Sequence, residues 1–226
     1  MITEDQKAES ERLWVKHEAQ ERERKAERER QAHDEWLDGI RRTVPYVHRV
    51  HGVWDIPDEG DDDQLHAGTC GWLAAMSGWD GYHGPSVMFS GTVGTGKSWQ
   101  ALRAVRHLVA ASGRRFDFAV ISETELTNAL RPGRSAANGD ALGRYLKSQL
   151  LLVDDLGSAR PSGWTEAEMF RLIDGRYRDG KPTLFTTNLP PKDLARPLGE
   201  RTTSRLAEMC HGHVVVPTGP DRRRRS

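Results

Sequence analysis

The segment Gly91–Ser98, GTVGTGKS, restricts the possible folds of this chain more than any other stretch. It matches G-x-x-x-x-G-K-[ST], the phosphate-binding loop, in which glycines allow successive backbone N–H groups to curl around an anion. The apolar run Val87–Phe89 precedes the loop, and a helix-compatible run, Trp99–Ala111, follows it. This context of strand, loop and helix predicts a nucleotide site at the end of a β-strand.

Two side chains of the loop have specific roles in this pattern. Lys97 is expected to contact the β- and γ-phosphates and to take part in catalysis, and the Ser98 hydroxyl is expected to bind Mg²⁺. The predicted nucleotide-binding residues are the whole loop and the residue after it: Gly91, Thr92, Val93, Gly94, Thr95, Gly96, Lys97, Ser98 and Trp99.

Helical and extended runs alternate from about residue 65 onward. Strands are expected over residues 86–90, 117–122, 149–155, 183–187 and 213–216. Helices are expected over residues 64–76, 97–111, 123–130, 141–147, 166–178 and 198–210. This alternation predicts an α/β fold, a five-stranded parallel sheet with helices on both faces. Ligands of such sheets bind at the carboxyl ends of the strands, where Gly91–Ser98 lies.

Polar side chains follow two of the predicted strands. The apolar run Leu150–Val153 ends in Asp154 and Asp155, which places carboxylates at the same sheet edge as the loop. Asp154 is expected to hold Mg²⁺ through water beside Ser98, and Asp155 to polarise the attacking water. Asn188 follows the apolar run LFTT. Its amide can donate to the γ-phosphate and orient that water.

Two arginines near the C-terminus are candidates for stabilising a transferring phosphoryl group. Arg205 lies on a predicted helix, and Arg222 lies just after the last predicted strand. A guanidinium can stabilise the charge that builds up on the phosphoryl group, in its own subunit or in a neighbouring one. Either side chain would otherwise be a solvated surface arginine, and Arg201 and Arg223 are the nearest alternatives.

Residues 1–45 differ in composition from the rest of the chain and are predicted to form a charged helical extension. They are rich in Glu, Arg, Lys, Ala and Gln, which favour helices, and opposite charges recur at spacings of three and four. One interpretation of this segment is a solvated extension. The other is a helix that docks a partner, which the presence of Trp14 and Trp36 on so polar a segment favours. Residues 46–64 are predicted to be a linker, and residues 65–226 the nucleotide-binding domain.

Composition argues against several classes of protein. The chain has 226 residues and zero formal net charge, so it is not as a whole an electrostatic nucleic-acid binder, although its end, DRRRRS, either contacts phosphate or is solvated. No apolar run is long enough to cross a bilayer and no secretory signal is recognised, so no membrane partner is expected. Cys70 and Cys210 form no C-x-x-C pair, which favours a cytoplasmic location. The spacings of His48, His51, His66 and Cys70 fit no common zinc pattern.

Taken together, GTVGTGKS, LLLVDDLG, LFTTNLP and ERTTSRL with the closing TGPDRR resemble the AAA+ ATPases of the DnaC/DnaI-like replicative-helicase loader group. The transposition helper ATPases of the IstB type are close relatives of that group. The resemblance runs from about Ser86 to Arg223. It implies ATP and Mg²⁺ as cofactors, and slow ATP hydrolysis that DNA and oligomerisation stimulate.

The resemblance also implies a role for each candidate residue. Gly91–Ser98 becomes the Walker A loop, Asp154 and Asp155 become the Walker B carboxylates, and Asn188 becomes sensor I. Most AAA+ proteins have Glu at the second Walker B position, whereas this chain has Asp155, as in the loader group.

The arginines take their roles from the same resemblance. Arg205 becomes the arginine finger, which acts on the ATP of the neighbouring subunit, and Arg222 becomes the sensor II arginine. Since only four residues follow Arg222 in this sequence, a separate helical lid domain is not expected.

The function implied by the resemblance is that of a loader, of phage or bacterial origin, that delivers a hexameric replicative helicase onto single-stranded DNA. Residues 1–45 would contact the helicase, and the ATPase domain would self-associate into a ring or spiral. The alternative is a transposition helper ATPase that acts on duplex DNA with a transposase. A small-molecule P-loop kinase would give no reason for Arg205 or Asn188, and a non-hydrolysing scaffold would not need Asp154 and Asp155.

Overall fold

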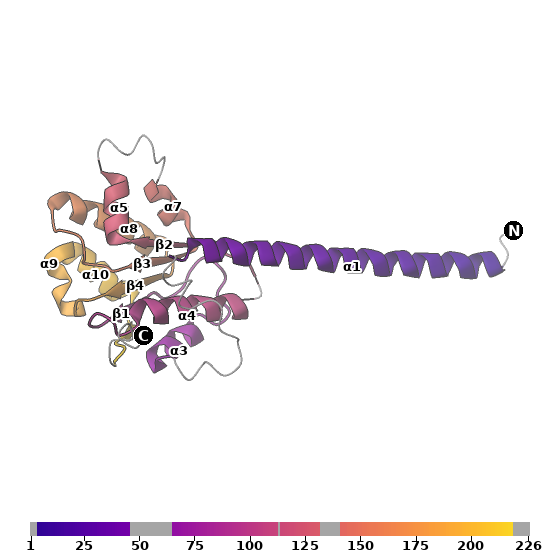
Figure 1. Cartoon of the computed structure of the whole chain (residues 1–226), viewed down its shortest axis with the longest axis horizontal. Helices are drawn as coiled ribbons and strands as arrows, with labels where there is room; N and C mark the ends of the chain where they lie inside the picture. The colour runs from indigo at the N-terminus through magenta and orange to yellow at the C-terminus, as the bar shows by residue number, and fades with distance from the viewer. Residues whose placement is uncertain (1–3, 46–64, 113, 132–140, 219–226) are drawn as a thin grey trace. The chain divides into compact units, whose positions relative to one another are not determined.

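The computed structural model describes residues 4–45, 65–112, 114–131 and 141–218 (Figure 1). The chain divides into two compact units, Met1–Arg42 and Thr43–Ser226, and each is considered by itself. The predicted linker 46–64 and the predicted sensor II arginine, Arg222, lie outside the described residues.

Helix α1 (Glu4–Thr43) is the charged helix predicted at the N-terminus, and it is 40 residues long. Ion pairs one turn apart support it: Arg22 Nη2 lies 2.6 Å from Glu18 Oε1, and Arg30 Nη2 lies 2.7 Å from Glu27 Oε2. Such pairs stabilise a helix that is polar on all sides. Among its described side chains, Trp14 is 66% exposed.

The second unit contains a five-stranded sheet in which every pairing is parallel, as predicted. In spatial order the strands are β2-β3-β4-β1-β5. The buried strands are rich in apolar residues, as strands covered on both faces must be. Their bounds are β1 (Val87–Ser90), β2 (Phe118–Ser122), β3 (Leu150–Asp154), β4 (Thr183–Thr187) and β5 (Val214–Val215).

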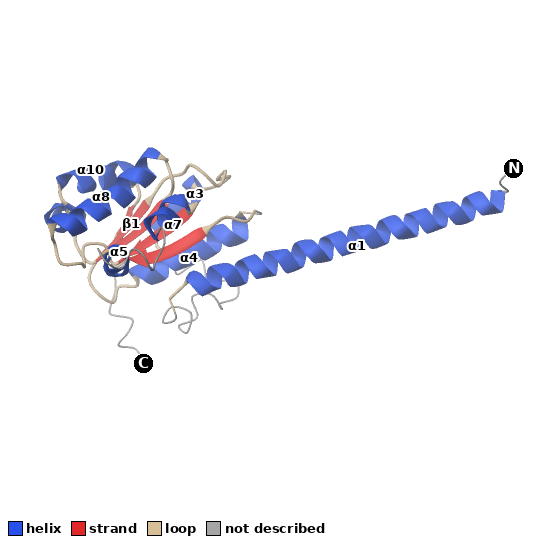
Figure 2. Ribbon diagram, turned by 90° about the horizontal axis from the view of Figure 1, so that it is seen from above, coloured by secondary structure: helices blue, strands red, loops and turns tan. Residues whose placement is uncertain are grey.

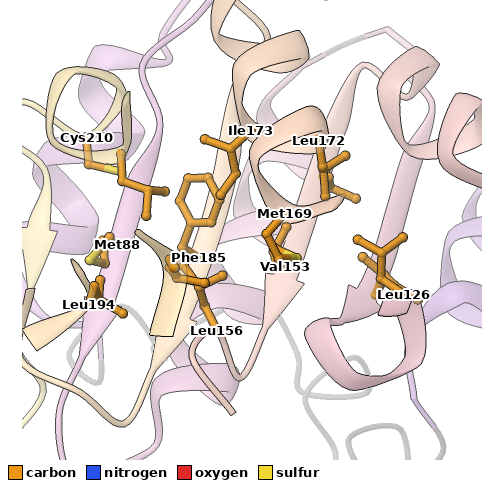
Figure 3. Close-up of a cluster of buried hydrophobic side chains, with 14 of the residues drawn as sticks. Met88, Leu126, Val153, Leu156, Met169, Leu172, Ile173, Phe185, Leu194 and Cys210 are labelled. Atoms are coloured by element: carbon orange, nitrogen blue, oxygen red, sulfur yellow. The ribbon is translucent and has the colours of Figure 1, made fainter. Parts of the chain in front are cut away.

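Helices cover both faces of this sheet (Figures 1 and 2). Helices α3 (Ala67–Ala75) and α4 (Lys97–Ala111) lie on one face, and α4 contacts β1 and β4. The opposite face carries α5 (Glu123–Leu130), α7 (Ala141–Lys147), α8 (Gly163–Arg178) and α10 (Glu200–Met209). On that face Met88, Val153 and Phe185 belong to one buried apolar cluster with Met169 and Ile173 from α8 (Figure 3).

Several boundaries differ from the sequence-based prediction because local capping groups set them. Helix α3 begins at Ala67 rather than at residue 64, since His66 Nδ1 accepts from the Gly68 N–H at 3.0 Å. Helix α8 begins three residues earlier than predicted because Ser162 and Thr165 form a reciprocal cap. Strands β1, β2, β3 and β5 are each one or two residues shorter than predicted.

The helix predicted over residues 198–210 is present as α10, which begins two residues later and ends one residue earlier than predicted. A separate short helix, α9 (Ala195–Leu198), precedes it, and Gly199 lies between the two at φ +79°. This backbone conformation interrupts a helix, and glycine adopts it without steric cost. A short 3₁₀ helix, η2 (Pro191–Asp193), precedes α9 and was not predicted.

None of the helices among the described residues combines the length and the apolarity that a membrane span requires.

Arg176 on α8 ties three elements together at the edge of the sheet opposite the phosphate-binding loop. It is 1% exposed, and its guanidinium donates to carbonyl oxygens of Tyr145, Ser148 and Pro182, each at 2.8 Å. Its Nε donates to Thr183 Oγ1 at 2.8 Å. The side chain therefore joins the end of α7 to the segment that leads into β4.

Replacing Arg176 with methionine is expected to destabilise the fold by about 3 kcal/mol, because the buried carbonyls lose their donors. Urea denaturation followed by circular dichroism measures this loss. Arg171→Met is the matched control on α8, since the Arg171 side chain is 61% exposed. We expect it to change stability by less than about 0.5 kcal/mol. Equal stabilities of the two variants would contradict the role given to Arg176.

Candidate nucleotide-binding site

The predicted phosphate-binding loop lies between β1 and α4. Gly94 and Gly96 adopt φ +82° and +87°, so two of the loop's three glycines stand where left-handed backbone is needed. Thr95 Oγ1 donates to the Thr92 carbonyl at 2.9 Å and closes the loop on itself. The first turn of α4 follows at once, and the N-terminus of a helix favours an anion.

Lys97 is the first residue of α4, and only 7% of it is exposed. Its Nζ donates to the Thr92 carbonyl at 2.7 Å, so the ammonium lies along the loop. The loop therefore holds a buried positive charge beside its backbone N–H groups, an arrangement suited to phosphate.

Asp154 lies at the end of β3 and joins a residue from the first turn of α4 to a residue of β4. Its Oδ1 accepts from Ser98 Oγ at 2.8 Å and from Thr186 Oγ1 at 2.6 Å. The two predicted metal ligands, Ser98 and Asp154, are thus brought together. Hydroxyl and carboxylate oxygens are the ligands that Mg²⁺ takes in proteins, so the donor set fits this ion.

Asp155 and Asn188 also lie together, as the prediction of a common sheet edge requires. Asn188 Nδ2 donates to Asp155 Oδ1 at 2.7 Å. Asp155 has φ +58° and is the one residue other than glycine with positive φ among those the structure describes. Its backbone N–H donates to Thr186 Oγ1 at 2.9 Å. Unusual backbone conformations of this kind concentrate at functional sites.

Thr186 is a site residue that the sequence reasoning missed. Its hydroxyl donates to Asp154 and accepts from the Asp155 backbone, so it fixes both aspartates. The pairing of Val153 with Phe185 in β3 and β4 places Thr186 beside Asp154. The available signal was a polar residue at a strand end, two positions before Asn188, but the order of the strands was needed to interpret it.

Two other predicted nucleotide-binding residues are Val93, in the middle of the loop, and Trp99, which directly follows it. Val93 is 59% exposed at the tip of the loop. Trp99 lies in the first turn of α4, and the Arg103 guanidinium carbon lies 5.4 Å from the centre of its ring. Contact of either with a nucleotide stays a prediction.

Arg205, the predicted arginine finger, lies on α10 within a cluster of its own chain's side chains. Its Nε lies 3.3 Å from Asp174 Oδ1, and its Nη1 lies 3.4 Å from Glu208 Oε1. The guanidinium carbon stacks 4.4 Å from the centre of the Tyr177 ring. Arg201, the nearest alternative, is exposed in the first turn of the same helix.

Comparison with known proteins identifies the family. The family model described as IstB-like ATP binding protein matches residues 82–226, more than half of the chain. This chain belongs to the IstB-like ATP-binding protein family. A putative ATP-binding protein in an insertion sequence of Mycobacterium tuberculosis is 30% identical to it over 159 residues. That match covers 68% of this chain and 61% of the relative, so the chain spans less than two thirds of the relative's length.

Two solved structures share the fold of this IstB-like chain. The DnaC helicase loader is 26% identical, with a TM-score of 0.55 over 65% of this chain and 86% of that one. DnaI superposes with a TM-score of 0.61 over 79% of this chain and 94% of that one, at 19% identity. The AAA+ resemblance and the α/β fold predicted from the sequence are therefore confirmed.

Proposed function

We propose that this IstB-like protein hydrolyses ATP in the site formed by Gly91–Ser98, Asp154, Asp155 and Asn188. The observation that carries the proposal is the pair of contacts at the sheet edge: Ser98 with Asp154, and Asn188 with Asp155. A nucleotide-binding protein without hydrolysis would not need a second carboxylate held by an amide at this place.

In this mechanism the loop and Lys97 bind and orient the phosphates, which lowers the barrier chiefly by positioning and charge stabilisation. Ser98 and Asp154 would hold Mg²⁺, which neutralises phosphate charge when it is bound. Asp155 accepts a hydrogen bond from the attacking water and turns it towards the γ-phosphate. Asn188 fixes the Asp155 carboxylate and offers its amide to the same region.

The transferring phosphoryl group needs one more positive charge, and Arg205 is the proposed source. We propose that Arg205 acts in trans, by contacting the ATP bound to a neighbouring subunit. Self-association into a ring or spiral is then part of the function. Arg222 is proposed to act as sensor II within its own subunit.

The process that ATP hydrolysis drives is proposed to be the loading of a hexameric replicative helicase onto single-stranded DNA. The likeness to the DnaC helicase loader over most of that chain supports this role. The exposed Trp14 on α1 supports it too, because an aromatic side chain on a charged helix is suited to anchoring a partner. A transposition helper is the second candidate, and the relative in an insertion sequence favours it.

Co-purification of the full-length protein with candidate partners from the same genome tests the choice. We expect the replicative helicase to be captured in the presence of ATP and Trp14→Ala to reduce capture at least about tenfold, as loss of an aromatic anchor does. Lys25→Ala, at another exposed position of α1, is the control and is expected to retain capture. Capture of a transposase instead of the helicase would replace the loader role with the helper role. ATP hydrolysis that depends on a small-molecule acceptor would contradict both.

A further inference from the structure

Glu123 is a buried carboxylate beside the turn formed by residues 155–159, and the proposed mechanism does not use it. It is the first residue of α5 and is 2% exposed. Its Oε2 accepts from three consecutive backbone N–H groups, those of Gly157, Ser158 and Ala159, at 2.6, 3.0 and 3.4 Å. These groups belong to the turn that begins at Asp155.

Three successive N–H groups that converge on one oxygen form an anion-binding concavity. Here a carboxylate of the same chain fills it. Burial raises the pKa of Glu123, the three N–H groups oppose that rise, and the negative charge of Asp155 adds to it. Burying a charge is costly, and Glu123 does not cap α5, since Ser122 does so together with Glu125. The buried charge therefore has a use other than starting the helix.

The use follows from the backbone of Asp155. A left-handed conformation in a residue other than glycine is strained and persists only where the surroundings impose it. The Ser158 N–H donates both to the Asp155 carbonyl, at 3.2 Å, and to Glu123. Glu123 thus holds the far side of the turn, while Thr186 holds the Asp155 N–H on the near side.

We propose that Glu123 is a positioning residue for ATP hydrolysis, which holds the turn 155–159 so that the Asp155 carboxylate stays against Asn188. The inference rests on the proposed ATPase function. When the Glu123 carboxylate is removed, the turn relaxes and Asp155 leaves its place, whereas the phosphate-binding loop on the other side of Asp154 is untouched. Hydrolysis slows and ATP binding does not change.

The test compares Glu123→Gln with Glu125→Gln, the matched carboxylate two residues later on the same helix, which bonds only within the Ser122 cap. Binding of a fluorescent ATP analogue gives affinity and the fraction of active sites, and single-turnover hydrolysis gives the rate per bound ATP. We expect Glu123→Gln to slow that rate about 10- to 100-fold, as a misplaced catalytic group does, with affinity within twofold of the wild type. Glu125→Gln is expected to match the wild type in both.

A rate per bound ATP in Glu123→Gln equal to that of the wild type would overturn the proposal, even if less protein were folded. Glu123→Asp keeps the charge on a shorter side chain, and the same comparison applies to it if the Gln variant does not fold. Amide exchange at Gly157–Ala159, measured without turnover, is expected to be faster in Glu123→Gln and unchanged in Glu125→Gln. If the wild type does not hydrolyse ATP, the proposed function fails by itself, and amide exchange still decides whether Glu123 holds the turn.

Discussion

Lys97→Ala is expected to abolish ATP binding at micromolar concentrations, and hydrolysis with it. The ammonium lies buried along the loop, where its attraction to phosphate is little screened by water. Loss of a charge-assisted contact in such a place costs about 3 kcal/mol, a weakening of ATP binding of about 100-fold. Isothermal titration with a non-hydrolysable ATP analogue measures the change.

Lys147→Ala is the control, since Lys147 is an exposed lysine at the end of α7. We expect it to bind ATP like the wild type. A thermal melt of Lys97→Ala without nucleotide shows that the fold persists. ATP affinity in Lys97→Ala within threefold of the wild type would contradict the assignment of this loop as the phosphate site.

Arg205→Ala is expected to leave ATP binding within about threefold and to lower hydrolysis by about a thousandfold in the assembled protein, the scale of an arginine finger. Steady-state phosphate release at protein concentrations above and below self-association measures this. At concentrations where the protein is monomeric, the variant and the wild type are expected to be equally slow.

Arg201→Ala is the matched control for Arg205, one turn earlier on α10 and exposed. If Arg201→Ala loses hydrolysis and Arg205→Ala keeps it, the finger is Arg201. Wild-type turnover in both variants would remove the proposed composite site. The contacts of Arg205 with Asp174 and Glu208 bear on this test, because the side chain must exchange at least one carboxylate for a phosphate when it acts in trans.

The main residues of the candidate site were predictable because they lie in a known motif or directly at the ends of apolar strands. A motif fixes Gly91–Ser98, and apolar runs that end in Asp154, Asp155 or Asn188 place those residues at one edge once the sheet is known to be parallel. The five strands and their direction followed from alternation alone. The roles of Arg205 and Arg222 came only from the family resemblance, and they stay predictions.

The residues that the sequence did not reveal, Thr186 and Glu123, owe their roles to which elements lie side by side in the fold. Thr186 acquires its role because β4 lies beside β3, an order that no local pattern encodes. Glu123 looked like an ordinary start of a helix, since its N–H partners are 34 to 36 residues away. The start of α10 differs from the predicted start by two residues because Gly199 has a positive φ, which the local sequence pattern does not show.

The two neighbouring aspartates of the proposed site differ in how rigidly they are held: Asp154 is held stiffly, whereas Asp155 can move more easily. Asp154, at the end of β3, is linked to Thr186 on the neighbouring strand β4 and to Ser98 in the first turn of α4, and the spacing of β3 and β4 is set by their ladder. Asp155 instead begins a turn that is held mainly by side chains, besides one backbone hydrogen bond from the Leu156 N–H to the Thr186 carbonyl at 2.7 Å. A turn of this kind yields at lower energy than a sheet does. A partner that binds to this turn would therefore change the rate of ATP hydrolysis without changing the affinity for ATP. The lifetime of bound ATP and the rate of its hydrolysis would then be set independently.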